Sequence, residues 1–137
     1  MRVGVSESSN TFPLLRLLAD GEFRSGAALS AALGVPGSGI RAGVSAMERL
    51  GLGVQKVPGR GYRLGEALDL LDRRQLRRAM RGIFSLEIVD QCASTNSVLL
   101  ERARNGAGHG LALACEHQIT GRGRRGKRWQ SGIGTDL

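Results

Sequence analysis

The sequence predicts an α+β protein in two parts, and two patterns carry that prediction. Residues 1–64 read as three short helices and a two-stranded hairpin, and residues 83–137 read as strand, helix and strand followed by a basic loop. Residues 65–82 are expected to form a connector and one helix. The predicted fold is therefore a small helical domain followed by the beginning of a mixed-sheet α/β domain.

Composition narrows the class of protein before any motif is considered. The 137 residues could bury one modest core or two small ones, and they contain no apolar run long enough to cross a bilayer. Residues 1–10 lack the apolar segment and cleavage site of a signal peptide. Cys92 and Cys115 have no disulfide framework spacing and, with the two histidines, match no zinc pattern. We expect free thiols, no metal site and a cytoplasmic protein, whose net charge of +8 favours phosphate-bearing or polyanionic partners.

Three helices are predicted in the first part from their caps and apolar spacing. Residues 11–13, Thr-Phe-Pro, resemble a helix start, because proline is tolerated in the first turn. Ser25 can cap a second helix, which Gly34 ends. Ser38 can cap a third, which Gly51 ends. The apolar stripes expected to face the core are Leu14, Leu17 and Leu18; Ala28, Leu29, Ala32 and Leu33; and Ile40, Val44, Met47 and Leu50.

A two-stranded hairpin is predicted directly after the third helix. Val54–Val57 and Tyr62–Leu64 alternate apolar and polar residues, and the turn between them contains proline and two glycines. A helix-turn-helix followed by a hairpin is a winged helix, in which the third helix would enter the major groove of DNA while the hairpin touches phosphates. The candidate DNA contacts are Ser38, Arg41, Ser45, Lys56, Arg60 and Arg63.

Two features keep another interpretation of this domain open. Gly39 and Gly43 lie inside the third helix, where each costs about 1 kcal/mol relative to alanine. Arg41 is the one cation placed where base edges would be met, whereas base readout leans on Arg, Lys, Asn or Gln. The alternative is a module for protein contacts whose basic residues form a solvated face.

The connector is predicted to lead into a helix over residues 72–81. Asp72 with Gln75 approximates a capping box. Leu76 and Met80 mark the apolar face. The arginines of this helix are expected to form a solvated face; they are Arg73, Arg74, Arg77, Arg78 and Arg81.

The second part is predicted to begin as an α/β unit. Residues 83–89 and 111–115 are expected strands, and Ser94-Thr95-Asn96 leads a helix that runs through Arg104. Taken alone, a Ser-Thr-Asn run is an ordinary set of N-cap residues.

The basic loop over residues 121–129, Gly-Arg-Gly-Arg-Arg-Gly-Lys-Arg-Trp, contains five cations and three glycines. Glycine lets backbone amides approach a ligand, and arginine donates bidentately to phosphate while staying charged. The loop therefore indicates recognition of a phosphate-bearing small molecule or of a nucleic acid. Its Gly-x-Gly-x-x-Gly spacing also matches a dinucleotide fingerprint, but the glycine-broken segment that follows opposes the helix which that fingerprint must open.

Several of these motifs, in this order, resemble the opening of the biotin protein ligase family. They are Ser94-Thr95-Asn96, Gln118, the basic loop and Trp129. The first part is similar to the winged helix of the bifunctional members, which also act as biotin operon repressors. Its residues 57–62, Val-Pro-Gly-Arg-Gly-Tyr, are similar to the hairpin of that regulatory domain, and residues 19–26 are similar to the turn between its first helices.

The resemblance implies a two-step ligase. Biotin and ATP would form biotinyl-5'-adenylate with loss of pyrophosphate, and the acyl group would pass to a lysine of a biotin carboxyl carrier domain. It implies that biotin is bound by Ser94, Thr95, Asn96 and Gln118. It implies that the loop closing over biotin and the adenylate contains Gly121, Arg122, Gly123 and Arg124. Trp129 is expected to hold the end of this loop in the core. Magnesium is expected with ATP, without identifiable ligands, and operator DNA and a second copy of the chain are expected partners.

The sequence also departs from the family pattern. The later Lys-Trp-Pro-Asn-Asp-type motif, which supplies an essential lysine, is absent, and Leu137 ends the chain inside the expected sheet. Asp136 stands where the family more often has a neutral residue. We therefore expect a truncated or fragmentary chain with unpaired strand edges, which does not complete catalysis alone. The alternative is a non-catalytic winged-helix regulator or partner-binding module.

Overall fold

The computed structural model describes residues 10–82, 85–130 and 132–134. The first two residues of the strand predicted over 83–89, and also Asp136 and Leu137, lie outside the described residues. The chain divides into two compact units, Met1–Leu68 and Asp69–Leu137. Each unit contains helices and strands, so the predicted α+β composition is confirmed. Within the described ranges, no helix combines the length and apolar character needed to span a membrane.

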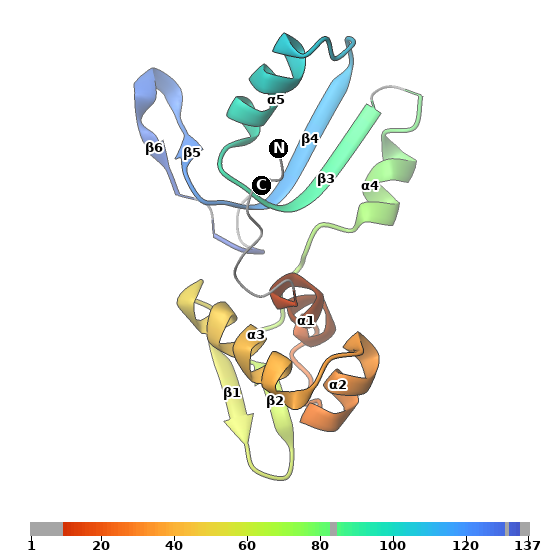
Figure 1. Cartoon of the computed structure of the whole chain (residues 1–137), viewed down its shortest axis with the longest axis vertical. Helices are drawn as coiled ribbons and strands as arrows, with labels where there is room; N and C mark the ends of the chain where they lie inside the picture. The colour runs from red at the N-terminus through yellow and green to blue at the C-terminus, as the bar shows by residue number, and fades with distance from the viewer. Residues whose placement is uncertain (1–9, 83–84, 131, 135–137) are drawn as a thin grey trace. The chain divides into compact units, whose positions relative to one another are not determined.

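The first unit holds three helices and a hairpin (Figure 1). They are α1 (Thr11–Leu18), α2 (Gly26–Leu33), α3 (Gly37–Arg49), β1 (Val54–Val57) and β2 (Gly61–Leu64). The strands pair antiparallel with Val54 opposite Leu64, which confirms the predicted hairpin. Ser25 caps α2 as predicted, because its Oγ accepts from the Ala28 amide at 3.1 Å. The cap predicted for Ser38 is wrong, since Pro36 with its extended backbone precedes α3 and Ser38 lies inside the first turn.

Side chains from all three helices and from β2 form the core of the first unit. The most deeply buried are Leu14, Leu15, Leu18, Leu29, Ile40, Val44, Met47 and Leu64. In α1, Leu15 is buried and the predicted Leu17 is half-buried, because positions 11, 14, 15 and 18 follow the helical period more closely. In α2, Leu29 is the buried member of the predicted stripe. The stripe predicted for α3 is confirmed at Ile40, Val44 and Met47.

Gly43 has a packing role that the sequence does not reveal. It is buried in α3, and a Cβ at this position would lie 2.9 Å from Cδ2 of Leu14 in α1. That distance is shorter than real Cβ contacts, so the glycine lets the two helices approach closely. The helix-propensity cost of this glycine is therefore offset by packing in the core.

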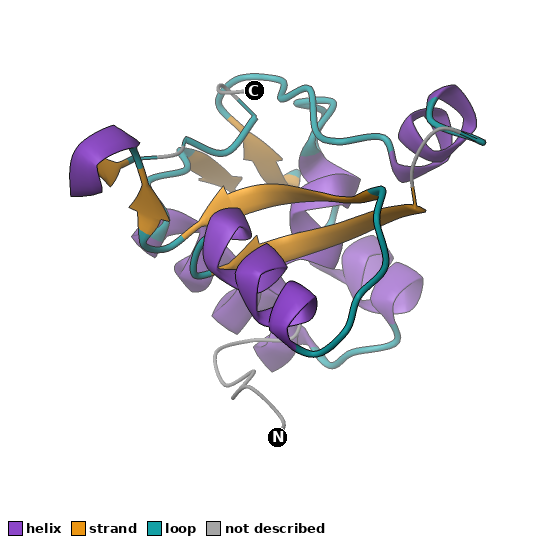
Figure 2. Cartoon of the chain, turned by 90° about the horizontal axis from the view of Figure 1, so that it is seen from above, coloured by secondary structure: helices purple, strands orange, loops and turns teal. Residues whose placement is uncertain are grey.

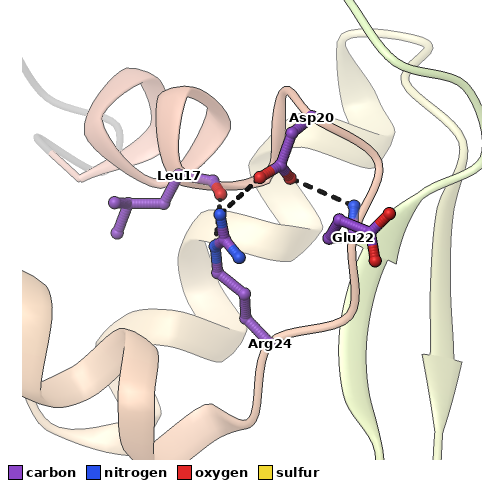
Figure 3. A network of polar contacts seen from close by, with 4 residues as sticks. All are labelled: Leu17, Asp20, Glu22 and Arg24. Carbon is purple, nitrogen blue, oxygen red and sulfur yellow. Dashed lines mark hydrogen bonds and ion pairs between the residues drawn. The ribbon is translucent and has the colours of Figure 1, made fainter.

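The turn between α1 and α2 pairs with the hairpin. Arg24 and Tyr62 exchange both backbone hydrogen bonds at 2.9 Å. Gly61 permits this approach, because its φ is +98° and a Cβ there would overlap the Arg24 carbonyl oxygen. The Arg24 side chain is also fixed, since it donates to the Leu17 carbonyl at 2.7 Å and to the Asp20 carboxylate (Figure 3).

The second unit is built on two parallel strands. Its elements are α4 (Arg73–Ala79), β3 (Ser85–Cys92), α5 (Thr95–Arg104), β4 (Leu111–Gln118), β5 (Gly121–Arg122), a 3-10 turn (Arg124–Gly126) and β6 (Arg128–Trp129). The two long strands, β3 and β4, run side by side from Ser85 opposite Leu111 to Cys92 opposite Gln118 (Figure 2). Both continue further than predicted, because backbone pairing does not stop where the side chains become polar.

Helix α4 begins at a side-chain cap. The Asp72 carboxylate accepts hydrogen bonds from the amides of Gln75 and Arg74 at 2.9 and 2.8 Å, and the Gln75 side chain donates to it as well. These hydrogen bonds, led by that of the Gln75 amide, lower the pKa of Asp72. Leu76 and Met80 are half-buried rather than buried, and the arginines of the helix are exposed as predicted.

Candidate ligand-binding site

The carboxyl ends of β3 and β4 bring three of the predicted site residues together. Parallel strands end at one edge of a sheet, where the following segments are free to form a ligand site. Gln118 is the last residue of β4, and α5 begins at Thr95 shortly after β3. The Thr95 amide donates to Gln118 Oε1 at 2.9 Å, and the Thr95 hydroxyl donates to the same oxygen at 3.2 Å. Gln118 therefore holds the start of α5 against the end of β4.

Ser94 is buried beside this contact, and its hydroxyl has no partner. The residue is 2% exposed, and Oγ makes no hydrogen bond within the described residues. Ser94 occupies the N-cap position of α5, yet its side chain does not cap the helix. Ser94 therefore occupies the expected N-cap position without making the side-chain capping bond. A buried hydroxyl without a partner is unfavourable, which makes Ser94 a candidate for a hydrogen bond to a ligand.

Asn96 stands apart from the other three predicted biotin contacts. It is exposed in the first turn of α5, and its side chain makes no hydrogen bond to any described residue. The geometry thus groups Ser94, Thr95 and Gln118 and leaves Asn96 facing solvent.

The predicted phosphate loop is a small hairpin. β5 and β6 pair antiparallel, with Gly121 opposite Trp129 and Arg122 opposite Arg128 (Figure 1). Glycine is required at 121, because a Cβ there would lie 2.9 Å from the Trp129 carbonyl oxygen. The Gly123 amide donates to the Lys127 carbonyl at 2.7 Å, so it is engaged within the hairpin. No long helix follows the glycines, only a three-residue 3-10 turn.

The cations of this hairpin face solvent. Arg122 and Arg124 are exposed, and no described carboxylate forms an ion pair with them. Trp129 is 53% exposed, so the prediction that it holds the loop in the core is wrong. Trp129 lies on a strand of two exposed residues that has only β5 as its partner among the described strands.

The polar residues along β4 have partners within the described part of the chain. Cys115 Sγ donates to the His117 carbonyl at 3.1 Å, and burial, followed by contact with Cys92, raises the pKa of Cys115 to about 12. Burial also lowers the pKa of His117, whose Nδ1 lies 3.0 Å from Gln91 Nε2. No three His, Cys, Asp or Glu side chains in the described part of the chain gather closely enough to hold a metal ion.

Sequence reasoning missed Glu116. This β4 residue is 7% exposed, and its carboxylate accepts from the Leu71 amide in the connector at 2.9 Å. The available signal was a glutamate directly after five small or apolar strand residues, 111–115, since buried carboxylates require partners.

The predicted DNA contacts lie on the surface of the first unit. None is buried; they are Ser38, Arg41, Ser45, Lys56, Arg60 and Arg63. On α3, the first three lie at i, i+3 and i+7, on the side opposite Ile40, Val44 and Met47. Lys56 forms an ion pair with Glu48 at 3.0 Å, which reduces the positive charge that it offers to a phosphate.

No family model matches the chain, but similar proteins cover most of it. It is 39% identical over 132 residues to the bifunctional ligase/repressor BirA of Escherichia coli (strain K12), covering 93% of this chain and 40% of that protein. It is 38% identical over 126 residues to BirA of Salmonella typhimurium, covering 90% of this chain and 38% of that protein. Over 64 residues it is 47% identical to the biotin--[acetyl-CoA-carboxylase] ligase of Mycobacterium tuberculosis, covering 43% of this chain and 24% of that ligase.

The chain thus spans about two fifths of the length of the two bifunctional relatives. Identity near 39% over nine tenths of a chain cannot arise from the basic loop alone, so the expected family relationship is confirmed. The chain is a homologue of the bifunctional biotin ligase/repressors over the part of those proteins that it spans.

Proposed function

We propose that the second unit supplies the biotin-binding and adenylate-binding elements of a biotin protein ligase. The observation that carries this proposal is the buried, unpartnered Ser94 hydroxyl beside the Thr95–Gln118 contact. Biotin presents hydrogen-bonding groups on an otherwise apolar body, which suits a site with a few convergent polar groups. Ser94, Thr95 and Gln118 would bind biotin from the strand ends, and Asn96 would join them from the exposed side.

The basic hairpin has the chemistry needed for the first step of the proposed reaction. The biotin carboxylate would attack the α-phosphate of ATP, and the phosphate oxygens would carry increasing negative charge as pyrophosphate leaves. Arg122 and Arg124 are exposed and free of carboxylates in the described residues, so they are available to stabilise that charge. Gly121 and Gly123 would let the backbone of the hairpin approach the ligand. A hairpin that covers the mixed anhydride would also exclude water.

The second step would transfer biotin to a lysine of a biotin carboxyl carrier domain. Magnesium is expected to accompany ATP, but the described residues contain no cluster that fits a metal, so no residue is assigned to it. The relatives that contain the homologous segment are named as ligases, which supports this proposal.

Calorimetric titration of the 137-residue chain with a non-hydrolysable biotinyl-adenylate analogue tests the proposal. We expect binding that is lost in the Arg122→Ala, Arg124→Ala double variant. The matched control is Arg77→Ala, Arg78→Ala, which removes the same charge from exposed positions on α4 and should bind normally. If both double variants lost the same binding affinity, the arginines of the hairpin would contribute only through the net charge of the chain. Absence of binding in the unmodified chain would contradict a preformed site.

We also propose that the first unit is a winged helix that binds DNA. The supporting observation is the succession α2, α3 and antiparallel hairpin, with Ser38, Arg41 and Ser45 on the outer face of α3. Phosphate contacts release counterions, so duplex binding should weaken steeply with salt. Arg41→Ala should reduce this binding. A duplex affinity that does not depend on salt would favour the alternative, a module for protein contacts.

A further inference from the structure

We infer that Phe23 is a positioning residue that holds Arg60 and Arg63 ready to bind the backbone phosphates of duplex DNA. The inference rests on the proposed DNA binding of the first unit and adds a residue that touches no base or phosphate in that proposal. It also joins two motifs that lie far apart in the sequence, the turn between α1 and α2 and the turn of the hairpin.

The two arginines both stack on the same aromatic ring. The guanidinium carbon of Arg60 lies 4.0 Å from the centroid of the Phe23 ring, and that of Arg63 lies 4.7 Å from it. Both distances are within the range of favourable cation–π contacts. Arg63 is held a second time, because its Nε donates to Gln55 Oε1 at 2.8 Å. No carboxylate among the described residues forms an ion pair with either arginine.

The backbone explains why the ring meets these side chains. Arg24, the residue after Phe23, pairs with Tyr62 of β2 through two backbone hydrogen bonds of 2.9 Å. The turn between α1 and α2 is therefore joined to β2 by an antiparallel bridge. Gly61 allows that pairing because it has no Cβ. Asp20 receives the Arg24 side chain and also the Glu22 amide at 3.0 Å (Figure 3). Phe23 is therefore fixed by the segments on both sides of it.

Stacking leaves the phosphate-binding groups of arginine available. A guanidinium contacts an aromatic ring through its face, whereas it donates to phosphate through the N–H groups at its edge. Both contacts can form at once. Because arginine loses considerable rotamer freedom on binding, side chains that are already ordered bind a phosphate more tightly. Lys56 on the same hairpin offers less, because Glu48 already pairs with it.

The test measures binding of a fluorescent mixed-sequence DNA duplex to the full 137-residue chain at several salt concentrations. We expect Phe23→Leu, which keeps all charges, to weaken binding by about fivefold to tenfold. The Arg60→Gln, Arg63→Gln double variant should bind more weakly still and should lower the slope of log affinity against log salt by about 2. Arg49→Gln removes an exposed charge from the end of α3 and is the control for general charge.

A double-mutant cycle separates positioning from loss of structure. Phe23→Leu should have no further effect in the Arg60→Gln, Arg63→Gln background, because the groups it positions are gone. The arginine Nε–H proton resonances should also lose their ring-current shift in Phe23→Leu, while the thermal unfolding of the unit stays close to that of the parent chain.

Each other outcome overturns the inference in a recognisable way. If the double arginine variant binds weakly while Phe23→Leu binds normally, DNA binding stands and the positioning role fails. If Phe23→Leu weakens binding equally in both backgrounds, the ring acts through the fold and not through these arginines. If the unmodified chain shows no salt-dependent duplex binding, the proposed DNA function fails and the arginines have no such ligand.

Discussion

The two units of the chain bury different kinds of residue. In the first, helices α1, α2 and α3 and strand β2 contribute ten buried apolar side chains: Phe12, Leu14, Leu15, Leu18, Leu29, Ile40, Val44, Ala46, Met47 and Leu64. In the described part of the second, the buried apolar side chains are Ile88 and Ile133, and α4 and α5 bury none. The buried polar residues are Thr11 in the first unit, beside its ten apolar ones, and Ser94 and Glu116 in the second.

This difference separates a region organised by its own core from one organised around polar groups. Strands of a parallel sheet are usually buried on both faces, whereas most residues of β3 and β4 are only half-buried. The first unit should therefore carry most of the stability. In its described part, the second carries a buried hydroxyl without a hydrogen-bond partner and an exposed cationic hairpin, which are the groups used in the proposed ligand site.

The largest effect expected from this comparison is on the core of the first unit. Leu14→Ala should lower the free energy of unfolding of that unit by about 2–5 kcal/mol, because Leu14 is fully buried between α1 and α3. Urea titration followed by circular dichroism measures it. Ile88→Ala in β3 is the matched core truncation in the second unit and should leave the transition of the first unit unchanged. Equal shifts from both variants would mean that the chain unfolds as one cooperative body.

A loss of comparable size is expected where the turn between α1 and α2 meets the hairpin. Gly61→Ala should destabilise the first unit by more than the roughly 1–3 kcal/mol of a strained positive φ, because its Cβ would also overlap the Arg24 carbonyl. Gly59→Ala is the control, since Gly59 has a φ of +76° but no atom within 4 Å of the added Cβ. Thermal unfolding of both variants compares them. Similar losses would show that conformation alone, and not the approach of Arg24, requires glycine at 61.

Local patterns predicted the elements of both units well. The Ser25 cap and the Val54–Val57 strand follow from a few neighbouring residues, and the structure contains both. The helix cap at Ser38 and the burial of Leu17 were predicted wrongly. In both cases the choice lay between neighbouring positions, and contacts with the rest of the chain decide it. Trp129 was wrong for a similar reason, since its exposure depends on which segments cover β6.

The candidate sites were harder to predict, because their contacts join distant residues. Glu116 and Leu71 are 45 positions apart, and nothing in either local sequence pairs them. The stack of Arg60 and Arg63 on Phe23 depends on the backbone pairing of Arg24, which no periodicity reveals. The Ser94–Thr95–Gln118 group was identified from family resemblance, and the unpartnered state of the Ser94 hydroxyl came only from the structure.

Ser94→Ala should weaken ligand binding by the second unit without lowering its stability. Removing a buried hydroxyl without a partner should leave stability unchanged or raise it by up to about 1 kcal/mol. Removing the hydrogen bond proposed to biotin should weaken binding of the biotinyl-adenylate analogue by up to about tenfold. Calorimetric titration and thermal unfolding measure the two effects. Ser97→Ala in the same helix is the control, and a loss of stability in Ser94→Ala would contradict an unpartnered hydroxyl.

The smallest effect concerns the Cys115 thiol in the second unit. Burial raises its pKa to about 12, whereas a cysteine in an unfolded chain has a pKa of about 8.5. The unfolded chain therefore releases this proton first as the pH rises. Stability from this group is fully present below about pH 8.5 and is lost progressively up to about pH 12.

Iodoacetamide labelling with peptide mass spectrometry should leave Cys115 unmodified at neutral pH in the folded chain and modify it after unfolding in urea. Rapid labelling of the folded chain at neutral pH would show that β4 opens readily, and the contrast between the two units would then extend to local unfolding.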